Sequence, residues 1–113
     1  MPWGSIEYEP EVEEWIRALT VDERAQVFFY IDLLEEKGVH LGEPYTRQLS
    51  GKLRELRFFM GREQRRITYL IASGRRIPLL TTFRKTRQRE QREIVRAKKA
   101  MEVWLDRQAK GSR

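Results

Sequence analysis

The feature that most constrains the fold is a change in the spacing of apolar residues along the chain. Apolar side chains recur at helical spacing over residues 10–37, alternate with polar side chains over 53–83, and return to helical spacing from about residue 87. A chain of 113 residues holds one hydrophobic core. We therefore expect one α+β domain over 1–113, in which an N-terminal strand and a helical hairpin pack on an antiparallel β-meander followed by a C-terminal helix.

The N-terminal segments are predicted from their own local signals. Residues 3–8 alternate as a short strand does, and a first helix follows over about 10–19. Thr20 and Glu23 have the spacing of a capping box at the start of a second helix, which ends at Gly38. These two helices are expected to form an antiparallel hairpin packed on the sheet.

The second of these helices has more apolar surface than one stripe requires. Its apolar set is already wide: Ala25, Val27, Phe28, Ile31 and Leu34. Phe29 and Tyr30 widen it further, and we expect this aromatic surplus to be a partner contact.

The meander is predicted from the two-residue period. Residues 38–51 contain three glycines and Pro44 and show no period, so they are expected to be a connecting loop. Strands are expected over about 53–59, 64–72 and 76–83. In the second of these, Ile67, Tyr69 and Ile71 should face the helices, and Arg66 should then project from the open face of the sheet.

Charge divides the chain into two halves of opposite sign. Residues 1–45, the strand and helical hairpin, carry three basic and eleven acidic side chains, a net −8. Residues 46–113, the meander and last helix, carry twenty basic and six acidic side chains, a net +14. This division indicates that the second half meets a polyanion such as nucleic acid or an acidic protein segment.

Composition excludes several kinds of chemistry. The chain has no Cys and a single His, His40, so cysteine nucleophiles, redox dithiols and Cys/His zinc sites are ruled out. No Gly-rich phosphate loop and no carboxylate cluster with metal-ligand spacing occur, and we expect no metal and no cofactor. No signal-peptide pattern and no apolar run long enough to span a membrane are present, so we expect a cytoplasmic protein with no membrane partner.

Cations on neighbouring strands are the distinctive residues. They are Lys52, Arg54, Arg57, Arg65, Arg66, Arg84 and Lys85. Adjacent strands lie about 5 Å apart, so we expect these side chains to converge on the open sheet face and hold phosphates. Only Glu55 on the strands and Glu63 in a turn are acidic, so most of these cations should lack a local partner. The alternative is an ordinary solvated sheet face in which Glu55 pairs with an Arg.

Three sequence blocks resemble a known family. Residues 48–58 (QLSGKLRELRF), 65–69 (RRITY) and 79–86 (LLTTFRKT) resemble the RelE/HigB type of toxin within the RelE/ParE toxin–antitoxin superfamily. Residues 93–97 (EIVRA) fit the HigB-like branch. The resemblance implies an α+β toxin of a type II toxin–antitoxin system that cleaves mRNA on the ribosome. Cleavage would proceed without a metal, by attack of the ribose 2′-OH on the adjacent phosphate.

The resemblance also implies roles for individual residues. Five match basic positions of the family and are candidate catalytic residues: Lys52, Arg54, Arg66, Arg84 and Lys85. A second set is expected to bind nucleic acid: Arg57, Arg65, Arg87, Arg89 and Arg92. Residues 84–93 lack the Tyr, His or Asp that other members have there, so the general acid and base stay unassigned.

Partners and alternative functions follow from the same resemblance. The implied partners are a cognate antitoxin, expected to be a helix-turn-helix protein, together with the ribosome and mRNA. One alternative is a ParE-type, non-enzymatic inhibitor of DNA gyrase, which has no use for cations that converge on phosphate. Another is an Arg-rich nucleic-acid binder without catalysis. The sequence shows no helix-turn-helix and no exposed aromatic sheet platform that would favour that alternative.

Overall fold

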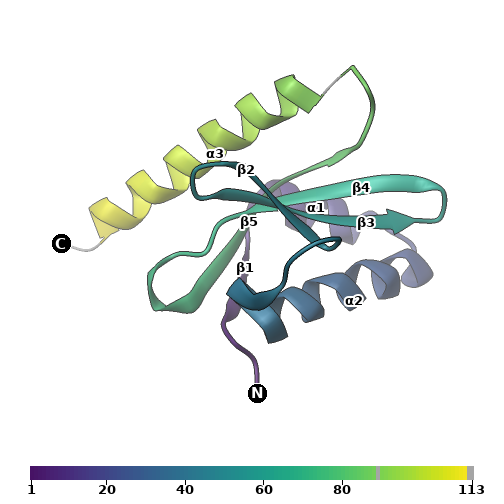
Figure 1. Ribbon diagram of the computed structural model, residues 1–113, viewed down its shortest axis with the longest axis horizontal. Helices are drawn as coiled ribbons and strands as arrows, with labels where there is room; N and C mark the ends of the chain where they lie inside the picture. Colours follow the sequence, from purple (N-terminus) through teal and green to yellow (C-terminus); the bar gives the residue numbers. More distant parts are fainter. Residues whose placement is uncertain (89, 112–113) are drawn as a thin grey trace.

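The computed structural model describes residues 1–88 and 90–111 and shows a five-stranded sheet with helices on both faces (Figure 1). In chain order the elements are β1 (Ser5–Tyr8), α1 (Pro10–Arg17), α2 (Val21–Lys37), β2 (Thr46–Ser50), β3 (Leu53–Met60), β4 (Glu63–Tyr69), β5 (Arg76–Arg84) and α3 (Glu90–Gly111). Short 3₁₀ turns at Gly38–His40 and Ser73–Arg75 lie between them. The expected single α+β domain is confirmed.

The sheet has the strand order β1-β5-β4-β3-β2. Strands β2 to β5 form an antiparallel meander, with Leu56 opposite Ile67 and Thr68 opposite Thr81. Strand β1 pairs in parallel with the first half of β5, so the N-terminus closes the far edge of the meander. The order therefore brings the beginning of the chain beside its last strand.

The prediction of a connecting loop over 38–51 is wrong for Thr46–Ser50, which form the edge strand β2. Only Thr46 of this strand is buried, so the segment has no apolar alternation that sequence reasoning could detect. Backbone pairing with β3 holds it in place, with a register shift between Gln48 and Ser50. An edge strand of this kind depends on its neighbour more than on its own side chains.

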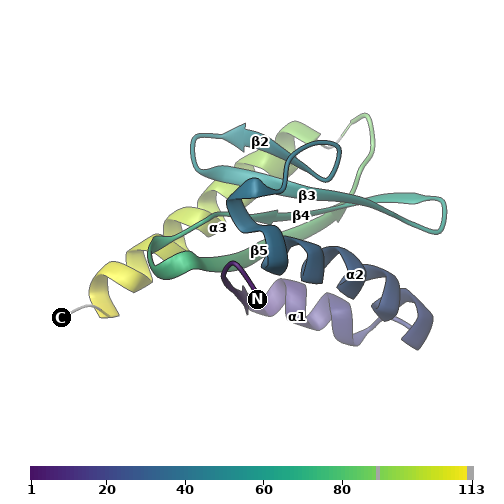
Figure 2. The same cartoon turned by 60° about the horizontal axis from the view of Figure 1, so that its bottom comes forward.

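Helices α1 and α2 pack as a hairpin on one side of the sheet, which we call the hairpin face (Figure 2). The predicted capping box starts α2: the Glu23 amide donates to Thr20 Oγ1 at 3.2 Å and the Thr20 amide donates to Glu23 Oε1 at 2.9 Å. The core on this side joins residues of both helices, the 38–45 loop and three strands. They are Val12, Ile16, Val27, Ile31, Leu34, Leu41, Leu56, Phe58, Met60, Ile67, Tyr69, Ile77 and Leu79.

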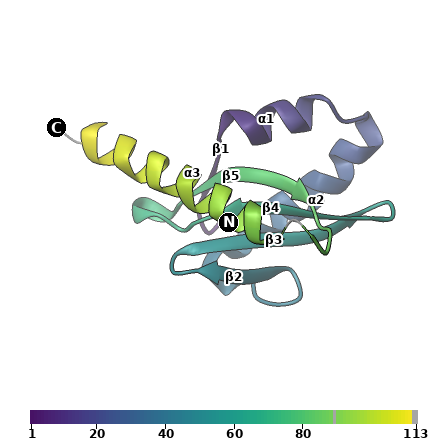
Figure 3. The same cartoon turned by 90° about the horizontal axis from the view of Figure 1, so that it is seen from above.

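The opposite side of the sheet, which we call the α3 face, is not fully open as predicted. Ala97 and Trp104 of α3 pack on Leu53, Leu70 and Leu80. Leu53 and Leu80 give β3 and β5 apolar residues on both faces, which is typical of strands covered on both sides, and Leu70 directly follows β4. The tip of the β3–β4 hairpin nevertheless extends past the first turn of α3 (Figures 1 and 3). Part of the α3 face is thus left uncovered near that turn.

Candidate functional site

A cluster of charged side chains lies on the α3 face near the start of α3. Arg57 of β3 and Arg66 of β4 are cross-strand neighbours. Glu55, only 1% exposed, places its Oε2 atom 3.4 Å from Nε of Arg66 and 3.7 Å from Nε of Arg57. One buried carboxylate therefore serves two guanidinium groups and holds them side by side.

A second ion pair borders this centre. Lys85, which follows β5, donates its backbone amide to the carbonyl oxygen of Gln64 at 2.8 Å and its Nζ to Oε2 of Glu90 at 2.7 Å. This hydrogen bond from Lys85 lowers the pKa of Glu90, and the charges of Arg47 and Arg66 lower it further. Glu90 is consequently ionised at neutral pH and ties the first turn of α3 to the end of β5.

Burial shapes the electrostatics of the centre. It raises the pKa of Glu55, against the opposing effect of Arg66 and Arg57, and it lowers the pKa of Arg66. Oε1 of Glu55 and the Nε atoms of Arg57 and Arg66 are buried without a hydrogen-bond partner in the described part of the chain. Because the two guanidinium groups share this one carboxylate, their charge is incompletely neutralised and favours an additional anion.

We refer to these residues and Arg47 together as the Arg57–Arg66 cluster: Arg47, Glu55, Arg57, Arg66, Lys85 and Glu90. Its cations outnumber its carboxylates by four to two, so its net charge attracts a phosphodiester.

The cluster opens into a hollow of about 290 Å³, which we call the aromatic hollow. Its lining combines aromatic rings with the two arginines: Tyr30, Pro44, Tyr45, Arg57, Phe58, Phe59, Gln64 and Arg66. Phe59 is 59% exposed, so one aromatic ring of β3 faces solvent at this end of the sheet. The hollow is where Arg57 and Arg66 meet solvent.

The structure brings only two of the five candidate catalytic residues, Arg66 and Lys85, into this cluster. Arg66 is 3% exposed and paired with Glu55, so the prediction that it projects from an open sheet face is wrong. Lys52 lines a different hollow, which it shares with Trp104 and Leu105 in the C-terminal half of α3. Lys52 directly precedes β3 and is five residue steps from Arg57, about 17 Å at the usual rise of a strand.

Arg54 and Arg84 lie on the hairpin face instead. Arg54 donates to Thr46 Oγ1 at 3.1 Å and to the Tyr69 hydroxyl at 3.4 Å, and Tyr69 belongs to the core of that face. Arg84 pairs with Glu63 at 3.5 Å. The predicted convergence of Lys52, Arg54, Arg66 and Arg84 is therefore wrong, because strand pleating sends alternate side chains to opposite faces and strand length separates the two ends.

The predicted nucleic-acid-binding residues also divide. Arg57 belongs to the cluster, whereas the Arg65 guanidinium lies 4.5 Å from the centre of the Trp15 ring on the hairpin face. Arg87 and Arg92 are exposed on either side of the start of α3, and their role stays a prediction. Arg89 lies outside the described residues.

Sequence reasoning missed the acidic members of the cluster. The alternative that Glu55 pairs with an Arg is confirmed, but its burial between two guanidinium groups was not expected. The signal was available, because Glu55 and Arg57 share one face of a strand. The expectation that most strand cations lack partners is wrong, since four of the seven pair with carboxylates: Arg57, Arg66, Arg84 and Lys85. No group of three or more His, Asp or Glu in residues 1–88 and 90–111 has the arrangement to hold a metal.

Two further properties bear on the class of protein. None of the helices in the described part of the chain has the length and apolar character needed to cross a membrane. The family model of the phage-derived Gp49-like proteins (DUF891) matches residues 14–102, which include the cluster and the aromatic hollow. A comparison with curated proteins gives no match. Because the family match covers most of the chain, the protein belongs to the Gp49-like family, a family of RelE-like toxins.

Proposed function

We propose that this protein is the toxin of a type II toxin–antitoxin system and that it cleaves mRNA bound to the ribosome at the Arg57–Arg66 cluster. The observation that supports this most strongly is the pair of incompletely neutralised guanidinium groups at the wall of a solvent-accessible hollow. The protein's membership of a RelE-like toxin family supports the same reaction class.

The chemistry suits these side chains. In the reaction the ribose 2′ oxygen bonds to the adjacent phosphorus and the bond from phosphorus to the 5′ oxygen breaks. The 2′-OH proton passes to solvent water, and the 5′ oxygen gains a proton. Arg57 and Arg66 stabilise the extra negative charge on the equatorial phosphoryl oxygens. Lys85 donates the proton to the leaving 5′ oxygen, and Glu90 holds its ammonium group in place at 2.7 Å. Glu55 positions the two arginines from beneath.

The family implies a cognate antitoxin. We propose a helix-turn-helix antitoxin, with translating ribosomes and their mRNA as the other partners, and we place the reaction in the cytoplasm. The net positive cluster offers an acidic antitoxin segment a surface to cover.

The test is cleavage of mRNA on purified translating ribosomes, measured by primer extension. We expect Arg57→Ala to lower the cleavage rate roughly 100- to 1,000-fold, which is the usual effect of removing one donor to a developing oxyanion. Arg57 is chosen because its side chain is 29% exposed and its loss leaves no buried gap comparable to that of Arg66. Lys85→Met should lower the rate by roughly 100-fold or more.

Arg62→Ala is the matched control, because Arg62 is an exposed arginine in the β3–β4 turn outside the cluster. It should cleave as the wild type does. Lys52→Ala separates the cluster from the site expected from sequence: full cleavage supports the cluster, and lost cleavage in a folded variant supports the site expected from sequence. Intact mRNA together with blocked supercoiling by DNA gyrase would establish the ParE-type alternative.

A further inference from the structure

We infer that the aromatic hollow binds one unstacked base of the RNA, the base of a nucleotide whose phosphate lies on Arg57 and Arg66. The inference rests on the proposed function and adds a base-binding subsite to it. The hollow holds Tyr30, one of the two aromatic residues that the sequence marks on α2, and the cleavage chemistry does not use its aromatic rings.

The aromatic rings of the hollow differ in how accessible they are to a ligand. Tyr30 stacks on Phe58, with ring centres 5.1 Å apart and planes at 20°, so those two rings already occupy each other. Tyr45 and Phe59 are 39% and 59% exposed. These two rings are therefore the surfaces on which a planar ligand can stack.

Polar groups lie beside Phe59 on the α3 face, whereas the Tyr45 ring lies 6.5 Å from the ring of Tyr30 on the other side of the hollow. Phe59 follows Arg57 by two residues on β3, about 7 Å along the strand, and is the cross-strand partner of Gln64. Gln64 Oε1 accepts from Arg66 at 3.4 Å, and its amide NH₂ group is a donor for the edge of a base. The order along the strands is thus guanidinium pair, then aromatic ring with amide, which matches a phosphate followed by a base.

The charge of Arg57 and Arg66 in the wall of the hollow favours a nucleotide over an apolar protein side chain as the ligand. An apolar side chain of a protein partner would bury the guanidinium groups of Arg57 and Arg66 without adding a counter-charge, which is costly. A nucleotide brings a planar ring for Tyr45 and Phe59 together with an anion for the arginines. Single-stranded RNA is recognised in this way, by stacking on aromatic side chains next to cations.

The experiment is an NMR titration of the full chain with two uncleavable 2′-O-methyl RNA tetranucleotides, one complete and one abasic at a single position. We expect Phe59→Ala to weaken binding of the complete probe roughly 5- to 100-fold, as loss of one base–aromatic stack does. The affinity of the Phe59→Ala variant for the abasic probe should equal that of the wild type. Tyr45→Ala should weaken binding of the complete probe in the same direction.

Phe29→Ala is the matched control. Phe29 is 62% exposed and contacts the edge of Tyr30, but it does not line the hollow. It should bind both probes as the wild type does. Equal weakening by Phe29→Ala and Phe59→Ala, an unchanged complete-probe affinity for Phe59→Ala, or no binding of either probe by the wild type would each overturn the inference. A Phe59→Ala variant that keeps its RNA affinity but loses the antitoxin would identify the hollow as a protein contact.

The two proposals fail separately. A chain that binds the complete probe through Phe59 but leaves mRNA on ribosomes intact contradicts the proposed cleavage and leaves the base site standing. A chain that cleaves mRNA through Arg57 and binds both probes equally contradicts the base site alone.

Discussion

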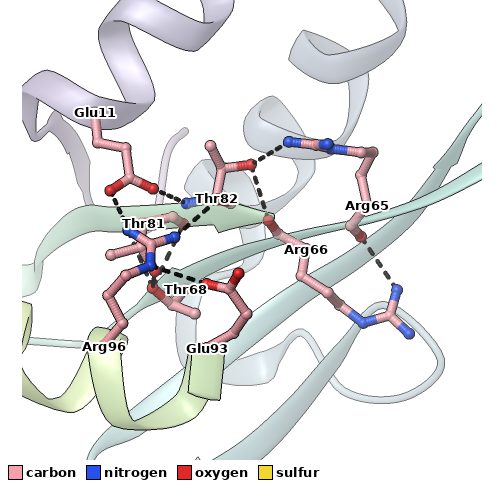
Figure 4. Close-up of polar contacts among 8 residues, drawn as sticks. All are labelled: Glu11, Arg65, Arg66, Thr68, Thr81, Thr82, Glu93 and Arg96. Atoms are coloured by element: carbon pink, nitrogen blue, oxygen red, sulfur yellow. Dashed lines mark hydrogen bonds and ion pairs between the residues drawn. The ribbon is translucent and has the colours of Figure 1, made fainter. Parts of the chain in front are cut away.

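Two consecutive arginines of β4 meet opposite environments. Arg65 enters the hairpin face, where it covers the Trp15 ring and donates to Thr82 Oγ1 at 3.1 Å. Arg66 enters the α3 face, where Glu55 holds it beside Arg57 at the wall of the aromatic hollow. Figure 4 shows the two side chains leaving the strand in different directions. The same residue type is a structural cation on one face and a candidate catalytic group on the other.

The faces differ in how they are buried. The hairpin face gathers a broad apolar core from two helices, a loop and three strands, whereas the apolar contact of the α3 face rests on Leu53, Leu70, Leu80, Ala97 and Trp104. The hairpin face therefore carries most of the folding energy, because stabilisation scales with buried apolar area. The α3 face can accommodate incompletely neutralised charge at one end because it contributes less to the core.

The largest effect is expected from truncating the anchor of α3. Trp104 is 3% exposed, and Trp104→Ala should cost about 3–5 kcal/mol of packing energy. Because the contact is small, we expect α3 to detach locally while the sheet stays folded. Hydrogen exchange should then be fast in the amides of α3 and slow in those of β3 and β4.

Ile31→Ala is the counterpart on the hairpin face. Ile31 is 1% exposed in the large core, and its truncation should cost about 2–5 kcal/mol and lower protection throughout the molecule. If Trp104→Ala also lowers protection everywhere, the two faces form one cooperative unit and the comparison fails.

A polar clamp joins the faces across β5. Strand β1 pairs only as far as Leu79, and beyond it the Thr82 amide donates to Glu11 Oε2 at 2.9 Å (Figure 4). Arg96 of α3 donates to the Thr82 carbonyl at 3.2 Å and pairs with both Glu11 and Glu93. Glu11 and Arg96 thus satisfy backbone groups that a neighbouring strand would otherwise bond.

The second prediction breaks this clamp. Glu11→Ala removes the acceptor of the Thr82 amide and the partner of Arg96, and should lower the free energy of unfolding by about 1–2 kcal/mol. The loss of stability is modest because the side chains of Glu11 and Arg96 are partly exposed. Denaturant unfolding measures it, with Glu14→Ala on the exposed side of the same helix as a control that should change little.

The third prediction separates the adjacent arginines. Arg65→Ala should cost about 1 kcal/mol of stability through the lost contact with Trp15, with mRNA cleavage unchanged. Thermal unfolding measures the loss of stability, and the ribosome assay on the same preparation measures mRNA cleavage. Impaired cleavage in the folded variant would show that the hairpin face takes part in the reaction.

A change in stability that depends on pH is expected for Glu55→Gln. Burial raises the pKa of Glu55, so the folded state binds this proton more tightly than the unfolded chain does. The stability of the wild type relative to Glu55→Gln should therefore be greatest below the ordinary glutamate pKa and fall as the pH rises from about 4 through the raised value. Unfolding at several pH values measures this difference.

The same variant should cleave poorly. Its neutral amide would no longer hold Arg57 and Arg66 by charge, and misplacement of such groups costs up to roughly 100-fold in rate. A Glu55→Gln variant with wild-type cleavage would show that the carboxylate does not position the arginines.

Sequence alone predicted the element types well and the site only in part. The capping box at Thr20 and the alternation around Ile67 are local signals, and both are confirmed. The edge strand β2 was missed, because its polar residues acquire strand structure only from pairing with β3. Arg66 and Lys85 were identified as candidates, whereas the burial of Glu55 and the contact of Glu90 with Lys85 depend on the packing of separate elements.

The sequence itself determined the order of helices and strands, because apolar spacing is a property of neighbouring residues. It also determined the concentration of positive charge in residues 46–113, which is a matter of composition. Tertiary structure decided which cations meet. Pleating placed Arg54 and Arg66 on opposite faces, strand length kept Lys52 about 17 Å from Arg57, and the position of α3 left one end of its face uncovered. Register and helix docking set these relations, because they arise from contacts between distant segments.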